Sequence, residues 1–166
     1  MKKLTALIAA ALCSMAVAAT AFAAELINAD QAKAIAAKYV PADSTYLVTL
    51  NELHKYHPFY EVKFYHNPTN TEYEVKVYQN GGAIKELSMD ANALVGSSRV
   101  VLAADNIKAM VQKEYPGAVI TKLELDRDDS LYEYEVEFRA AGLRGEMTIN
   151  PETGAVLDKE IKYDFK

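Results

Sequence analysis

The chain has little material for the commonest catalytic chemistries. Its 166 residues include one cysteine, three histidines and no tryptophan. The cysteine, Cys13, lies in an apolar stretch at the start that we interpret below as a removable leader, so the rest of the chain has no thiol. It can form no disulfide and offers no thiolate as a nucleophile or metal ligand. No serine stands in a G-x-S-x-G context either, which leaves little for a Ser/His/acid site.

Positive charge is also scarce. The chain has 18 Lys and Arg against 23 Asp and Glu. Two of the lysines lie in the leader, so the remainder carries a net charge of -7. This balance excludes a nucleic-acid binder held by bulk electrostatics, which needs a basic surface. The apolar share is 51% of the whole chain and falls to roughly 46% without the leader, which is still too high for a disordered protein, and we expect a packed core.

Residues 1–24 have the pattern of an export signal. Lys2 and Lys3 precede an alanine-rich apolar stretch, and Ala21-Phe22-Ala23 supplies small residues where a signal peptidase reads them. We predict cleavage after Ala23 or Ala24, a periplasmic or secreted product and no membrane span after cleavage. The alternative is an uncleaved anchor, but alanine contributes little to membrane insertion.

The remaining sequence is a duplication. Three blocks recur in the same order with offsets of 75, 74 and 72 residues: Asp30–Lys38 with Asp105–Lys113, Tyr60–Phe64 with Tyr134–Phe138, and Gly82–Ile84 with Gly154–Val156. We predict one repeat over residues 25–92, a linker over 93–98 and a second repeat over 99–166, because Gly96-Ser97-Ser98 interrupts every periodic pattern.

Each repeat is expected to begin with a helix. Apolar residues recur there at helical spacing, as Ala32, Ile35, Ala36 and Tyr39 in the first repeat and as Ile107, Met110, Val111 and Tyr115 in the second. Pro41 and Pro116 end these runs, and Asn28 with Gln31 resembles a capping pair.

The spacing then changes to period two, which is typical of strands. It predicts strands over residues 60–65, 73–78 and 83–89, and over 119–126, 131–139, 146–150 and 155–163. Residues 66–70 read as a hairpin loop and Asn80-Gly81-Gly82 as a turn. The fold class is therefore α+β, with two tandem repeats, each an N-terminal helix packed on an antiparallel meander of three to four strands. The sequence leaves open whether the two meanders join.

The second repeat resembles the PepSY domain. The resemblance rests on Tyr115-Pro116-Gly117 closing the helix, Tyr134-Glu135-Val136-Glu137 in mid-sheet and Asn150–Leu157 at the last turn. The first repeat departs from this pattern, since Tyr39-Val40-Pro41-Ala42 lacks the glycine. The resemblance implies an exported domain of the kind found in propeptides of secreted metallopeptidases, which restrains peptidases or binds peptides.

Metal and acid/base sites find weak support. His54 and His57 precede a strand, where their spacing puts the two rings on opposite sides, and His66 stands apart. A calcium loop at Asp126, Asp128 and Asp129 would lack the sharp-turn glycine. Three glutamates, Glu133, Glu135 and Glu137, alternate along a strand with no histidine nearby. We therefore expect no enzyme activity, no metal and no cofactor.

The remaining candidate for a functional site is an exposed face of the sheet. Polar and tyrosine side chains share the face of the first sheet that does not build the core, and they form our candidate partner-binding face: Glu61, Lys63, Tyr65, Glu74, Lys76 and Tyr78. The same face in the second repeat is mostly acidic, with Glu124, Asp126, Glu133, Glu135, Glu137 and Glu146 relieved by Lys122 and Arg139. The competing interpretation is that half-exposed antiparallel sheets always carry such residues.

The expected function is non-catalytic binding of a protein or peptide, with an extracytoplasmic peptidase as the partner that the resemblance implies. A strand edge or extended segment would serve such binding. One alternative is an envelope-associated structural module with no peptidase partner. Another is a small-ligand or enzyme site, which would need a pocket between two sheets.

Overall fold

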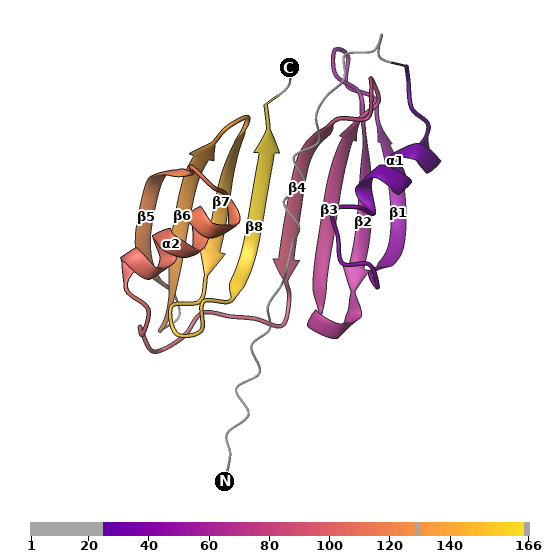
Figure 1. The fold of residues 1–166 in the computed structure, drawn as a ribbon. Coiled ribbons are helices and arrows are strands. Elements are labelled where there is room, and N and C mark those ends of the chain that lie inside the picture. Colours follow the sequence, from indigo (N-terminus) through magenta and orange to yellow (C-terminus); the bar gives the residue numbers. More distant parts are fainter. Residues whose placement is uncertain (1–24, 129, 165–166) are drawn as a thin grey trace.

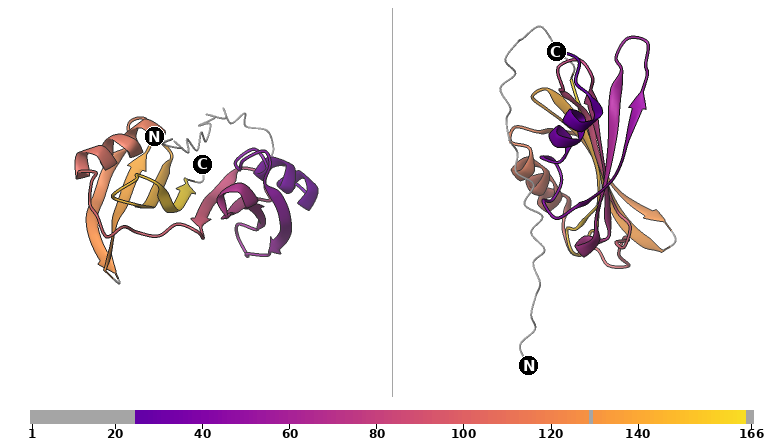
Figure 2. Two further views of the ribbon diagram at one scale, coloured as in Figure 1. Left: turned by 90° about the horizontal axis from the view of Figure 1, so that it is seen from below. Right: turned by 90° about the vertical axis from the view of Figure 1, so that its right-hand side faces the viewer.

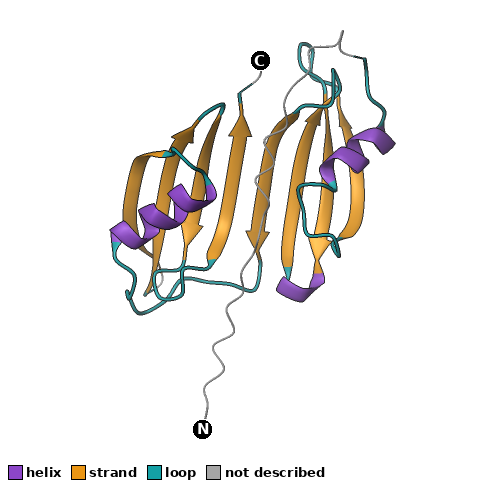
Figure 3. Ribbon diagram, viewed as in Figure 1, coloured by secondary structure: helices purple, strands orange, loops and turns teal. Residues whose placement is uncertain are grey.

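The computed structural model describes residues 25–128 and 130–164, which form an α+β fold with two α-helices and one eight-stranded antiparallel sheet (Figures 1 and 3). The N-terminal half contains α1 (Ala29–Ala36), β1 (Thr45–Glu52), β2 (Phe59–His66), β3 (Thr71–Tyr78) and β4 (Ile84–Ala91). The C-terminal half contains α2 (Ala104–Glu114), β5 (Val119–Asp128), β6 (Leu131–Ala140), β7 (Leu143–Ile149) and β8 (Val156–Tyr163). The predicted leader, residues 1–24 with Cys13, lies outside the described residues.

The strand order is β1-β2-β3-β4-β8-β7-β6-β5. Each half is a meander in chain order, and the two meanders join through their last strands. In this joint Glu86–Asp90 of β4 pair antiparallel with Asp158–Lys162 of β8. The first strands, β1 and β5, therefore form the two outer edges of one continuous sheet (Figure 1).

Both helices lie on the same face of this sheet, and no helix of the described residues covers the other, which we call the uncovered face (Figure 2). The predicted cap of α1 is present: Asn28 Oδ1 accepts a hydrogen bond from Gln31 N at 2.9 Å, and Gln31 Oε1 accepts one from Asn28 N at 2.8 Å. The helix turns Ala32 and Ala36 toward the sheet, and both are fully buried. In α2 the buried residues are Ile107 and Val111, at the spacing that the sequence indicates.

The core lies between the helices and the side chains that alternate with the polar ones along each strand. Its best-buried strand members are Val62, Phe64, Val75, Val77, Val136, Phe138, Ile149 and Ile161. Neither half has a separate core, since these residues form one cluster with the buried side chains of both helices.

Strand β1 was not predicted. Its pairing with β2 shifts register between Tyr46 and Val48, so Leu47 is an extra residue in a bulge. The bulge brings three apolar residues together in the sequence and hides the period-two signal. The other strands match the predicted ones within a few residues, and residues 67–69 form a short 3-10 helix inside the predicted hairpin loop.

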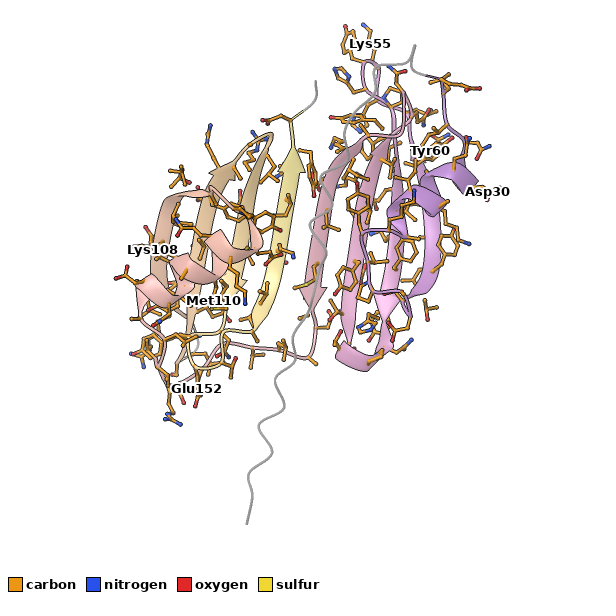
Figure 4. All side chains as sticks on the ribbon, viewed as in Figure 1. Asp30, Lys55, Tyr60, Lys108, Met110 and Glu152 are labelled. Carbon is orange, nitrogen blue, oxygen red and sulfur yellow. The ribbon has the colours of Figure 1, made fainter. Side chains whose placement is uncertain are left out.

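The predicted linker is bound to the C-terminal half. The backbones of Ser97 and Tyr132 exchange two hydrogen bonds of 3.0 and 2.7 Å. Asn150 Nδ2 donates to Val95 O at 2.8 Å, and Ser97 Oγ donates to Glu152 Oε2 at 2.6 Å. Glu152 lies in the turn at the lower end of the C-terminal half (Figure 4). The Asn-Pro-Glu turn therefore holds the connection in place.

Candidate functional site

The uncovered face of the sheet is the candidate site. The antiparallel register aligns its side chains in rows that cross all eight strands. One such row consists of Val48, Lys63, Glu74, Ser88, Glu160, Glu146, Glu137 and Lys122, each beside the next. Surface properties of the two halves therefore meet without a break at the joint between β4 and β8.

The charged residues predicted for the partner-binding face are brought together in one ion-pair chain. Lys63 Nζ lies 3.2 Å from Glu61 Oε1 and 3.0 Å from Glu74 Oε2. Lys76 Nζ lies 3.1 Å from the other oxygen of Glu74 and 2.5 Å from Glu86 Oε1. All five side chains are only 10–29% exposed. Glu86, on β4, is a member of this chain that the sequence pattern did not reveal.

The pKa directions within this chain favour the charged forms. Hydrogen bonds to Glu74 and then Glu61 raise the pKa of Lys63. Burial works to lower the pKa of Lys76, but its bonds to Glu86 and Glu74 outweigh burial and raise it. Burial likewise works to raise the pKa of Glu74, and its bonds with Lys63 and Lys76 lower it overall. This part of the face is a pre-ordered, nearly neutral polar surface.

The tyrosines of the predicted face lie at its two ends. Tyr65 donates a hydrogen bond to Asn70 Oδ1 in the hairpin loop. Tyr78 lies opposite Phe59, and both are less than 10% exposed although they belong to the uncovered face. The loop between β1 and β2 accounts for this burial, because its His57 ring meets Tyr78 edge to face at 6.2 Å.

A ring and a cation complete this covered end. His54 stacks on Phe59 with 5.1 Å between ring centroids. Lys85 Nζ lies 4.5 Å from the centroid of the same ring, within cation–π distance. Tyr78 therefore belongs to a small aromatic cluster under the β1–β2 loop, and the open part of the predicted face centres on Lys63, Tyr65, Glu74 and Lys76.

In the C-terminal half the same face is acidic, and like charges lie directly opposite each other. The register pairs Asp90 with Asp158, Glu160 with Glu146, and Glu146 with Glu137. The acidic residues expected from the sequence are present here, and β4 and β8 add Asp90, Asp158 and Glu160. Alternation in Asp158-Lys159-Glu160 is the signal that could have identified the last two.

Cations balance only part of this acidity. Lys122 Nζ lies 2.8 Å from Glu135 and 3.2 Å from Glu124, which raises the pKa of the lysine. Lys162 pairs with Glu160. Burial raises the pKa of Asp158 above its ordinary value of 3.8, and the carboxylates of Asp90 and Glu146 add to the rise.

Asp158→Asn is expected to stabilise the protein at neutral pH. Removing a charge that faces like charges should raise the free energy of unfolding by about 0.5 kcal/mol. Because the pKa of Asp158 is higher in the folded state than in the unfolded one, its ionised form costs stability at neutral pH. That cost disappears as the pH falls through the folded pKa toward 3.8. Urea unfolding at pH 7 and pH 4 measures the effect, and an equal gain at both values would contradict the assignment.

The histidines do not converge. His66 is buried on the helix side, with Nε2 3.0 Å from Asp43 Oδ1 and Nδ1 2.6 Å from Thr69 Oγ1. These contacts tie the β2–β3 hairpin to the segment before β1. The Thr69 hydroxyl is shared with Thr71 Oγ1 at 2.8 Å. We assign this Asp-His-Thr arrangement to structural support.

Neither a metal centre nor a deep pocket is evident in the described part of the chain. No group of three or more His, Cys, Asp or Glu among residues 25–128 and 130–164 could hold a metal ion. The two best-formed depressions are shallow, about 180 Å³ each, and lie on the acidic face around Glu137 and Glu146. The small-ligand alternative requires a pocket between two sheets, whereas the eight described strands form one sheet.

A search of curated proteins gives no match. Among solved structures, the C-terminal domain of Bacillus megaterium YpeB is similar with a TM-score of 0.50 and 14% identity, covering 81% of this chain and 63% of that one. A putative lipoprotein from Clostridium difficile 630 shares 17% identity with a TM-score of 0.34, covering 80% of this chain and 91% of that one. The chain thus spans less than two thirds of the YpeB structure.

Neither α1 nor α2, the two helices of the described residues, has the length and apolar character that a membrane span needs.

The family model of the PepSY domain, described as "Peptidase propeptide and YPEB domain", matches residues 26–86 and again residues 101–160. The two matches cover both halves of the sheet, and no catalytic family is indicated. The chain therefore belongs to the PepSY family.

Proposed function

We propose that this protein is an exported, non-catalytic module that binds a protein or peptide and inhibits or regulates an extracytoplasmic peptidase. The observation that carries this proposal is the double match to a family named for peptidase propeptides, at residues 26–86 and 101–160. In the proposed organisation, residues 1–24 are a cleaved signal and the repeats occupy residues 25–92 and 99–166, joined by residues 93–98.

The uncovered face is the proposed binding surface. Its proposed contact residues are Glu61, Lys63, Tyr65, Glu74 and Lys76, and Tyr78, which lies under the β1–β2 loop, would support them from the covered end. Two properties support this choice. The ion pairs hold the charged side chains in place before binding, so little side-chain entropy would be lost. The face also lies opposite the two described helices, so neither helix stands between it and a partner (Figure 2).

A pull-down from the native secretome, combined with a peptidase assay, tests the proposal. The bait is the chain from residue 25 onward. Its variant combines Lys63→Gln, Tyr65→Ala and Lys76→Gln, because glutamine keeps a donor for Glu74 and should preserve the fold. The matched control is Lys108→Gln on the solvent side of α2, where the lysine pairs only with exposed Asp105 at 3.0 Å (Figure 4). Circular dichroism verifies that all three proteins are folded.

We expect the parent and the control to retain a peptidase and to reduce its activity at stoichiometric amounts, and the triple variant to lose at least about tenfold in affinity, as for a truncated contact centre. If all three proteins retain the peptidase equally, the peptidase role is supported and the proposed binding face is wrong. Co-sedimentation with cell-wall material without any peptidase would instead favour an envelope-associated module.

A further inference from the structure

The two outer edges of the sheet differ in charge. Edge strands expose unpaired backbone groups, and proteins usually guard them with charged side chains. The β5 edge follows this rule with Lys122, Glu124, Asp126 and Arg127. The β1 edge, at the equivalent place in the other half, has no charged residue from Thr45 to Asn51. Its bulge at Leu47 interrupts only the first part of the strand, because Val48–Glu52 pair with β2 in regular register.

This uncharged edge is also apolar and exposed. Leu47 is 50% exposed, Leu50 is 40% and Val48 is 36%. The loop that follows β1 continues this surface with Leu53 at 81% and Tyr56 at 75%. An uncharged edge of this length with exposed aliphatic side chains is suited to adding another strand.

We propose that the strand added at this edge is β1 of a second copy of the chain, in antiparallel orientation. In a two-fold pairing centred on Thr49, Val48 of each copy lies opposite Leu50 of the other. Both residues belong to the uncovered face, as their pairing with Lys63 and Glu61 of β2 shows. The pairing thus forms two aliphatic cross-strand contacts and one Thr–Thr contact, and it places no charge in the centre.

The alternative two-fold register, centred on Leu50, is less favourable. It would place Val48 opposite Glu52 in both copies and so set an aliphatic side chain against a carboxylate. Registers between these two would place side chains of opposite faces against each other, which the pleat forbids. The Thr49-centred pairing is therefore the one that the residues of β1 favour.

Charge at the ends of the strand agrees with this orientation. Asp43 precedes β1, with its side chain 67% exposed. Lys55 follows it in the loop that projects beyond the end of the sheet (Figure 4). Antiparallel pairing brings Asp43 of one copy toward Lys55 of the other, whereas parallel pairing would set Asp43, Glu52 and Lys55 each beside its own copy.

The resulting interface is small. A single strand ladder with its flanking loops falls below the roughly 1,600 Å² of a standard interface, so we expect a dissociation constant on the order of 10–100 μM. The test must therefore detect a weak dimer.

A single-cysteine trap meets this need, because the chain from residue 25 onward has no cysteine of its own. Thr49→Cys would place two thiols across the dimer axis, within the Cα separation that a disulfide allows. Leu125→Cys, an exposed apolar position on the guarded β5 edge, is the matched control. Under mild oxidation, we expect covalent dimer to form at least about tenfold faster with Thr49→Cys than with the control.

Complementary charges test the register. A homodimer of Val48→Lys would place each new lysine against Leu50, and a homodimer of Leu50→Glu would place each new glutamate against Val48. Sedimentation velocity of either variant alone should therefore show monomers. Mixing the two variants should restore association, because the lysine introduced at position 48 of one copy then faces the glutamate introduced at position 50 of the other. A variant that is merely misfolded would not be rescued by its complement.

Two results would overturn the proposal. One is Thr49→Cys that cross-links no faster than Leu125→Cys. The other is a parent chain that stays monomeric at about 200 μM, several times the expected dissociation constant. Either would leave the β1 edge free for an extended peptide from another protein. The proposal does not depend on the proposed function, and its failure would not affect the peptidase assay.

Discussion

Gly145→Ala is expected to lower the free energy of unfolding by about 3 kcal/mol. Gly145 lies in the middle of β7 on the helix side, directly between its cross-strand neighbours Phe138 and Ile161. A Cβ atom there would come within 2.3 Å of Phe138 Cζ and 2.7 Å of Ile161 Cδ1. Both neighbours are buried to 1% or less, so neither can move aside without displacing the core.

A double-mutant cycle with Phe138→Leu identifies the cause. Leucine shortens the side chain that occupies the space over Gly145, so the double variant should be more stable than the sum of the two single changes predicts. Urea unfolding at pH 7 gives the four free energies. A cost below about 1 kcal/mol for Gly145→Ala would mean that the core at β7 is looser than the contacts indicate.

Glu114→Ala is expected to cost about 2 kcal/mol, the second large effect. Lys159 on β8 faces the helix side and is 2% exposed, and its Nζ lies 2.8 Å from Glu114 Oε1 at the end of α2. Removing the carboxylate would leave a buried ammonium group without its partner. Because Glu114 itself is 30% exposed, water can reach the site and limit the loss.

The companion change, Lys159→Met, should cost little or no stability. Methionine fills much the same volume without a charge, so the variant is expected to stay within about 1 kcal/mol of the parent or to exceed it in stability. Combining it with Glu114→Ala should remove most of the cost of the latter. Thermal unfolding of the four proteins decides the matter, and additive losses would show that the pair does not act through the buried charge.

Local patterns predicted the local elements well. The Asn28–Gln31 cap, the helical spacing of Ile107 and Val111, and the loop before β3 are interactions between residues close in sequence. Strand β1 was not predicted from the sequence, because its bulge at Leu47 breaks the alternation of polar and apolar residues and because an edge strand needs no buried face. The pattern of a strand is visible only where one of its two sides must avoid water.

The sequence predicted which side of β2 and β3 forms the candidate face, but not the members that β4 and β8 add or the interactions among them. Period two correctly placed Glu61, Lys63, Glu74 and Lys76 on one side of β2 and β3. The partnership with Glu86 depends on the register of β3 with β4, and that register shifts by one residue near Val77. The covering of Tyr78 depends on where a loop turns, which side-chain alternation does not encode. The union of the two meanders in one sheet likewise depends on β4 and β8, which lie far apart in the sequence.

That union has a mechanical consequence. The ladder between β4 and β8 joins five residue pairs, from Glu86 with Lys162 to Asp90 with Asp158, whereas every other ladder joins seven or more. It is also the ladder that ends on two facing carboxylates. Under mechanical load or in partial unfolding, we expect the sheet to separate first between β4 and β8. Each half would keep its helix and its own four strands, and the core cluster that both halves share would be divided at this joint.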